Sequence, residues 1–93
     1  MFGYRSLLPL REDTAPVSLG EGSTPLIHLG DLGEWIGLGR LYVKDETRNP
    51  TWSYKDRLAA VAVSHARGAG ADTVVVATTG NHGAAVAAYA AAA

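Results

Sequence analysis

Residues 49–57 read Asn-Pro-Thr-Trp-Ser-Tyr-Lys-Asp-Arg and lead from a turn into a predicted helix. Ser53 and Asp56 have the spacing of a capping box, which predicts that the helix begins at Ser53 and places Lys55 in its first turn. A lysine amine must lose its proton before it attacks a carbonyl. The positive end of the helix dipole, with Arg57 nearby, favours the neutral amine. We therefore predict that Lys55 forms a Schiff base with a phosphate-bearing aldehyde cofactor.

The elements around this stretch predict an α/β fold. Residues 41–46 read as a strand, residues 53–67 as a helix stopped by Gly68 and Gly70, and residues 73–78 as a buried β-branched strand. An alanine-rich helix follows. Leu58, Val61, Ala62 and His65 have the spacing of one helical face. A βαβα series over residues 41–93 predicts a parallel sheet with right-handed crossovers.

The N-terminal segment, residues 1–40, looks irregular. Glycines and a proline punctuate a turn at residues 20–26, and a short strand is expected at residues 26–29. Residues 31–38 predict a short helix that ends at Gly39. Trp35 is expected in the core, as is Tyr89 from the alanine-rich helix.

Composition narrows the class of protein. The chain has 93 residues, with 47% hydrophobic and 18% charged residues, which is ordinary for one small folded domain. A net charge of -1 gives no reason to expect nucleic acid or a membrane surface as partner. There is no cysteine and no signal-peptide pattern, so we expect a cytoplasmic protein. His28 and His65 lack the spaced partners of a metal site, and no metal is expected.

A second motif, Thr-Thr-Gly-Asn-His-Gly at residues 78–83, links the second strand to the alanine-rich helix. The free N–H groups at such a helix start form an anion site. The motif is not a dinucleotide fingerprint, because Thr78 stands where its first glycine would be. Lys55 and Asn81 each follow a strand and open a helix, so we expect both at the carboxyl edge of the sheet, where ligands bind.

Both motifs resemble those of fold-type-II pyridoxal-phosphate-dependent enzymes, and the sequence is most similar to the threonine synthase group. N-P-T-x-S-[FY]-K-D-R is similar to the lysine motif of that family, and G-E-G-x-T-P-L at residues 20–26 to the opening of threonine-synthase-like chains. The resemblance implies the N-terminal portion of a three-layer parallel-sheet fold, with pyridoxal 5'-phosphate on Lys55. Asn81 would contact the cofactor ring oxygen. The residues that would cradle a substrate carboxylate are Thr78, Thr79, Gly80, Asn81 and His82.

The implied reaction converts O-phosphohomoserine and water to threonine and phosphate. The resemblance also implies a small amino acid as substrate and a homodimer for the full-length protein. A serine or threonine dehydratase is an alternative, because G-N-H-G also occurs there. A non-catalytic truncated fragment is another: the chain stops at four alanines inside a helical pattern, before any phosphate-binding loop. One departure is Trp52, where the family usually has glycine.

Several residues also have plainer interpretations. Lys44, the only other lysine, reads as a structural charge pair with Asp45 and Glu46. Asn81 could be a helix N-cap, a role compatible with a cofactor contact. His82 is expected to shape the loop rather than act as a general base.

Overall fold

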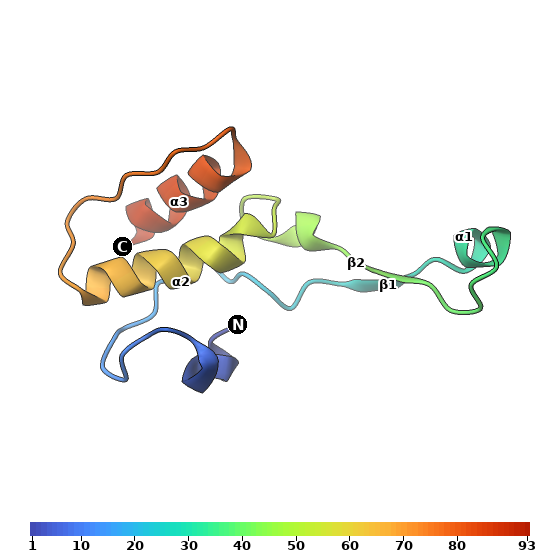
Figure 1. Cartoon of the computed structure of the whole chain (residues 1–93), viewed down its shortest axis with the longest axis horizontal. Coiled ribbons are helices and arrows are strands. Elements are labelled where there is room, and N and C mark those ends of the chain that lie inside the picture. The colour runs from blue at the N-terminus through green and yellow to red at the C-terminus, as the bar shows by residue number, and fades with distance from the viewer.

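The computed structural model describes all 93 residues and consists of a helical body with a projecting arm (Figure 1). The body contains α2 (Lys55–Gly68) and α3 (Asn81–Ala92). The arm contains β1 (Leu26–His28), α1 (Gly30–Trp35) and β2 (Tyr42–Lys44), and 3-10 turns span Phe2–Leu7 and Glu46–Arg48. The molecule measures 52 × 30 × 17 Å with a radius of gyration of 16.3 Å. A compact chain of this length would have a radius of about 12 Å, so the arm extends well beyond the core.

The core lies between α2 and α3. Residues 69–80 run back along the body, so the two helices lie side by side and point in the same direction (Figure 1). The buried apolar residues are Val17, Ala59, Ala60, Val63, Ala85, Val86 and Tyr89. Alanines dominate this set, and their small side chains let the two helices approach closely. Because both helices run the same way, their N-termini lie at the same end of the body.

The helix α2 begins two residues later than predicted, and the capping box is not formed as expected. Ser53 Oγ accepts a hydrogen bond from the Lys55 backbone N–H at 3.1 Å. The Asp56 carboxylate reaches back to Thr51, accepting from its N–H at 3.1 Å and its hydroxyl at 2.8 Å. Asp56 is fully buried. The Asp56 carboxylate therefore accepts from Thr51, and not from the Ser53 N–H as a capping box would require.

The predicted face of α2 is not the face that packs against α3. The buried positions are Asp56, Ala59, Ala60, Val63 and Ser64, whereas Leu58 is half exposed. Two stripes of this helix have the right period, and the smaller side chains fit the close approach of α3. Leu58, Val61, Ala62 and His65 instead line a shallow apolar hollow beside Pro9.

The sheet also differs from the prediction. Its two strands, β1 and β2, pair antiparallel, with Ile27 opposite Val43. Residues 73–78 form no strand, and Val75 is 91% exposed. A β-branched run becomes a strand only beside a hydrogen-bonding neighbour, and these residues have none. The predicted parallel βαβα sheet is therefore absent from residues 41–93.

The arm exposes most of its apolar side chains. The helix α1 spans six residues, and the chain leaves it through Gly37 at φ +75°, before the predicted stop at Gly39. Trp35 is 83% exposed, so its predicted place in the core is wrong, while that of Tyr89 is confirmed. None of the helices has both the length and the hydropathy needed to span a bilayer.

Candidate functional site

One groove is lined by all the site residues expected from the sequence. Tyr54 and Lys55 form one side and residues 77–82 the other, around a volume of about 830 Å³. The groove includes Thr78, Thr79, Gly80, Asn81 and His82. The expected sheet edge is absent, so the two motifs meet for another reason: the parallel packing of α2 and α3 brings both helix starts to the same end (Figure 1).

Lys55 is the first residue of α2 and is half-buried. Its Nζ lies 4.9 Å from the centre of the Tyr54 ring, an aromatic contact that limits where the amine can move. Arg57 was expected to act on this amine, but its guanidinium points elsewhere. It donates to both oxygens of Glu46, at 2.7 and 2.8 Å. The positive charge of Arg57 is therefore paired with Glu46 rather than directed at Lys55.

The loop before α3 is shaped by Thr78. Its hydroxyl oxygen accepts from the Gly80 N–H at 3.1 Å and from the Gly83 N–H at 2.9 Å. Gly80 has a φ of +152°, which only glycine adopts readily. A Cβ on Gly83 would overlap the Thr78 methyl group. Both glycines are thus needed for the threonine side chain to close this turn.

The start of α3 leaves donors free. The backbone N–H groups of Asn81 and His82 make no hydrogen bond, whereas Thr78 accepts from those of Gly80 and Gly83. The Asn81 side chain does not cap the helix, so the N-cap interpretation is not what the structure shows. These free groups face a groove at the positive end of a helix, an arrangement that suits an anion.

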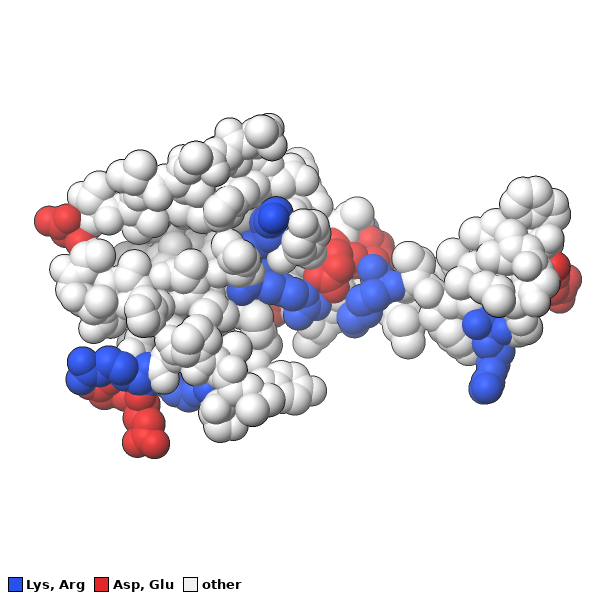
Figure 2. All heavy atoms as spheres, in the orientation of Figure 1, with Lys and Arg blue, Asp and Glu red and all other residues white.

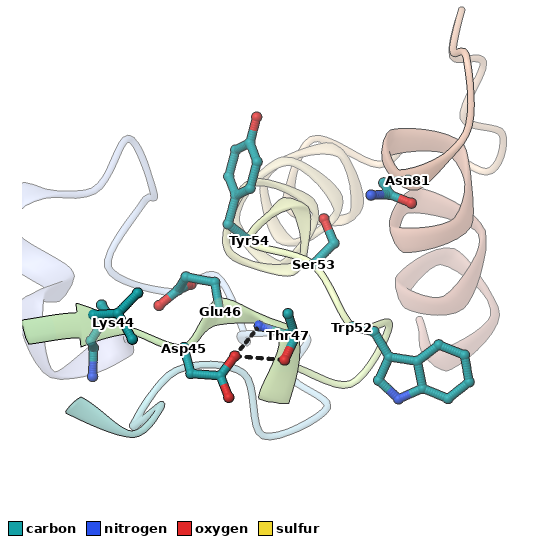
Figure 3. A pocket seen from close by; sticks show the side chains of 9 residues that line it. Lys44, Asp45, Glu46, Thr47, Trp52, Ser53, Tyr54 and Asn81 are labelled. Atoms are coloured by element: carbon teal, nitrogen blue, oxygen red, sulfur yellow. Dashed lines mark hydrogen bonds between the residues drawn. The ribbon is translucent and has the colours of Figure 1, made fainter. Parts of the chain in front are cut away.

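A second hollow of about 380 Å³ adjoins the groove and shares Tyr54 and Asn81 with it. In Figure 3 the Asn81 amide points across toward Ser53 and Tyr54, whereas the Trp52 indole turns outward, away from the other labelled side chains. The remaining lining residues come from β2 and the 3-10 turn after it: Val43, Lys44, Asp45, Glu46 and Thr47. Ser53 was expected only as a helix cap and Tyr54 only as a neighbour of Lys55, so neither was predicted to line a second hollow.

The turn that carries Lys55 is held by a polar cluster where the arm meets the body. Hydrogen bonds from Arg57, then Thr24 and Asn49, lower the pKa of Glu46 to about 2. Asn49 Nδ2 donates to Glu46 at 3.0 Å, and Asn49 Oδ1 accepts from the Gly22 N–H at 3.0 Å. Charged side chains gather at this junction in Figure 2. The cluster fixes residues 46–57 against the glycine-rich turn at residues 20–26.

Lys44 does not compete for the main groove. Its ammonium donates to the carbonyl oxygen of Thr24. The charge pair predicted with Asp45 and Glu46 is absent, because Glu46 pairs with Arg57 and Asp45 accepts from Thr47 instead. No cluster of residues suited to a metal ion is present.

Comparison with known proteins points to the same class of enzyme as the residues that line the groove. The family profile described as "Pyridoxal-phosphate dependent enzyme" matches residues 17–93. The chain is 48% identical over 86 residues to threonine synthase of Halalkalibacterium halodurans, covering 92% of this chain and 24% of that enzyme. It is 44% identical over 88 residues to threonine synthase of Methanocaldococcus jannaschii, covering 95% and 22% respectively. The chain spans about a quarter of the length of these curated relatives. It therefore belongs to the pyridoxal-phosphate-dependent enzyme family, as a segment homologous to threonine synthases.

Proposed function

We propose that this chain supplies the cofactor lysine and the substrate-carboxylate loop of an enzyme of the threonine synthase type. That reaction converts O-phosphohomoserine and water to threonine and phosphate. The observation that supports it most is the shared groove, in which Lys55 lies opposite the loop at residues 77–82. We further propose that the groove belongs to the three-layer fold of fold type II and to a homodimer.

The groups in the groove fit pyridoxal 5'-phosphate. The fit rests on the half-buried amine of Lys55 and the side-chain amide of Asn81, which makes no capping hydrogen bond, in the same groove. Lys55 would bind the aldehyde carbon of the cofactor, and Asn81 would contact its ring oxygen. When bound, the cofactor supplies an electron sink for negative charge at the substrate α-carbon.

The remaining groups have roles that follow from their chemistry. The free N–H groups of Asn81 and His82, with the hydroxyl of Thr79, would hold the α-carboxylate of an amino acid. That orientation directs the α-C–H toward Lys55. The Lys55 amine, once released from the cofactor, would take and return a proton at that carbon. Tyr54 would limit the positions that this amine can reach.

A serine or threonine dehydratase remains the second candidate, because the Gly-Asn-His-Gly turn suits either substrate. A chimera separates the two. The matched segment of the H. halodurans threonine synthase is replaced by this chain's segment, and the purified protein is assayed with O-phosphohomoserine, serine and threonine. Release of phosphate with formation of threonine supports the proposal. Formation of a 2-oxo acid from serine or threonine, without phosphate release from O-phosphohomoserine, supports the alternative.

Two substitutions in the same chimera serve as controls. Lys55→Ala should lower turnover by at least about 10²-fold, since it removes the proton-transferring amine. Lys44→Ala should leave turnover within about twofold, because its ammonium bonds the Thr24 carbonyl outside the main groove. A chimera that folds and binds cofactor yet catalyses neither reaction would leave only a non-catalytic role for this segment.

A further inference from the structure

Trp52 has a strained backbone conformation, and no contact within the chain offsets the strain. Its φ is +60°, in the left-handed region that a bulky residue rarely adopts and that glycine adopts without cost. The indole is 81% exposed, so burial does not offset the strain. Tryptophan, which has the largest side chain of the twenty amino acids, therefore occupies a position where glycine would be less strained.

The conformation is imposed by its surroundings. The Trp52 N–H donates to the Asn49 carbonyl at 2.8 Å, and Asn49 is itself buried. On the other side, Asp56 holds the Thr51 N–H. The turn is thus fixed from both ends and cannot relax to relieve Trp52. Strain that is held in this way is typical of functional sites.

The position of Trp52 points to a ligand. It lines the hollow of about 380 Å³ that shares Tyr54 and Asn81 with the main groove. A ligand whose carboxylate lies at Asn81 and whose α-carbon faces Lys55 can therefore extend its side chain past Asn81 into this hollow. Figure 3 shows the indole at the margin of the residues that line this hollow, turned away from Tyr54 and Asn81, so only the outer part of a bound side chain would meet it.

The charged groups of this hollow are already engaged. Lys44 donates to the Thr24 carbonyl, Asp45 accepts from Thr47, and Glu46 accepts from Arg57. The surfaces left for a ligand are therefore the aliphatic and aromatic side chains of Val43, Tyr54 and Trp52. Such surfaces bind hydrocarbon, so they suit the carbon chain of a substrate rather than a charged group at its end.

We propose that Trp52 is a specificity-determining residue, the outer wall of a subsite for the aliphatic part of the substrate's side chain. The inference rests on the proposed function, because it needs an amino acid held at Asn81 and Lys55. The contact with the substrate carbons would then offset the strain that the free chain retains. Each methylene of the side chain that enters the subsite leaves water and packs against the indole.

The test is a series of straight-chain amino acids of increasing length. The chain is equilibrated with pyridoxal 5'-phosphate, and dissociation constants are measured by calorimetry for L-alanine, L-2-aminobutyrate, L-norvaline and L-norleucine. Four proteins are compared: the unsubstituted chain, called the parent from here on, and the variants Trp52→Gly, Trp52→Phe and Trp35→Gly. Trp35 is the other tryptophan of the chain and is equally exposed, on the distant arm, so it controls for the loss of an indole.

In the parent we expect affinity to rise about three- to fourfold per added methylene. Trp52→Gly should flatten this dependence, leave the affinity for L-alanine unchanged and raise the midpoint of thermal unfolding, since the strain is removed. Trp52→Phe should restore much of the dependence, and Trp35→Gly should keep all of it. Trp52→Gly with an unchanged dependence on length, or a parent with none, would overturn the inference.

Labelling of Lys55 by cofactor and borohydride, measured on the same samples, separates this inference from the proposed function. A labelled Lys55 with no effect of Trp52 overturns the subsite and leaves the proposed function standing. An unlabelled Lys55 overturns the proposed function, and with it the placement of the substrate on which the subsite depends.

Discussion

The hydroxyl of Tyr89 donates a hydrogen bond of 2.9 Å to Glu21 Oε2, which joins two residues 68 positions apart. Tyr89 is 0% and Glu21 is 5% exposed. Ser18 and Leu19 donate to the same oxygen, so one carboxylate ties the N-terminal turn to α3. Burial, then the hydrogen bond to Glu21, raises the pKa of Tyr89 well above its ordinary value. The phenol therefore stays a donor, and α3 stays tied to the N-terminal turn.

Removal of the Tyr89 hydroxyl should destabilise the chain. Tyr89→Phe leaves a buried carboxylate with one donor fewer, and its other oxygen, Oε1, already has no hydrogen bond. We expect a loss of about 1–3 kcal/mol in the free energy of unfolding, measured by urea denaturation. Tyr4→Phe, at an exposed position, should change stability by less than about 0.5 kcal/mol. Equal effects of the two substitutions would show that the Glu21 contact contributes nothing.

Acid should weaken the junction through Glu46. Its pKa falls from 4.5 to about 2 on folding, so the folded chain prefers the ionised carboxylate. The stabilisation is fully present above pH 4.5 and is lost as the pH falls toward 2. Because the Arg57 side chain is 34% exposed, solvent screens the pair and we expect only about 1 kcal/mol. Thermal unfolding across this pH range, for the parent and for Glu46→Gln, measures the difference.

In the Glu46→Gln protein the loss of stability in acid that is due to Glu46 should disappear. Added salt should also change its stability less than that of the unsubstituted chain. Asp13→Asn is the matched control, since Asp13 and Arg11 form an exposed ion pair. A Glu46→Gln protein that keeps the parent's full acid dependence would contradict the assignment to Glu46.

The start of α3 should not tolerate a methyl group at Gly83. Gly83→Ala places a Cβ against the Thr78 methyl, in the loop that shapes the groove. We expect a loss of about 1–3 kcal/mol in unfolding free energy, together with weaker binding of amino acids. Gly39→Ala, where the added Cβ meets nothing, should have little effect.

A double substitution tests the stated cause. Thr78→Ser removes the clashing methyl and keeps the hydroxyl that accepts from Gly80 and Gly83. Gly83→Ala should therefore cost less in the Thr78→Ser background than in the parent. Additive costs would mean that some other contact makes Gly83 necessary.

The residues expected to form the site lie in one groove, although the parallel sheet expected to bring them together is absent. Lys55 and Asn81 were expected together at one sheet edge, because each follows a predicted strand and opens a helix. The structure brings both into one groove through the packing of α2 on α3 instead. The expected parallel sheet is absent, since residues 73–78 have no hydrogen-bonding neighbour to make them a strand. Local patterns thus located the starts of α2 and α3 to within two residues, whereas sheet pairing depends on partners that a local pattern does not specify.

Two further features could not be obtained from local patterns. Periodicity allowed either stripe of α2 to be buried, and the close approach of α3 selected the alanines at positions 59 and 60. The tryptophan at position 52 did not indicate a positive φ, because tryptophan avoids that region. The one indication was that the resembling family usually has glycine there. Its conformation follows from the hydrogen bonds on both sides of the turn, which involve Asn49 and Asp56.

The most direct test of the account is chemical labelling of Lys55. The chain is mixed with pyridoxal 5'-phosphate, reduced with borohydride, digested and analysed by mass spectrometry, with Lys55→Arg as control. Lys44 and the N-terminal amine are the competing primary amines. We predict a phosphopyridoxyl group on Lys55, accompanied by violet-region absorbance before reduction, both lost in Lys55→Arg. Labelling of Lys44, or of all three amines equally, would contradict the claim that the groove between α2 and α3 holds the cofactor.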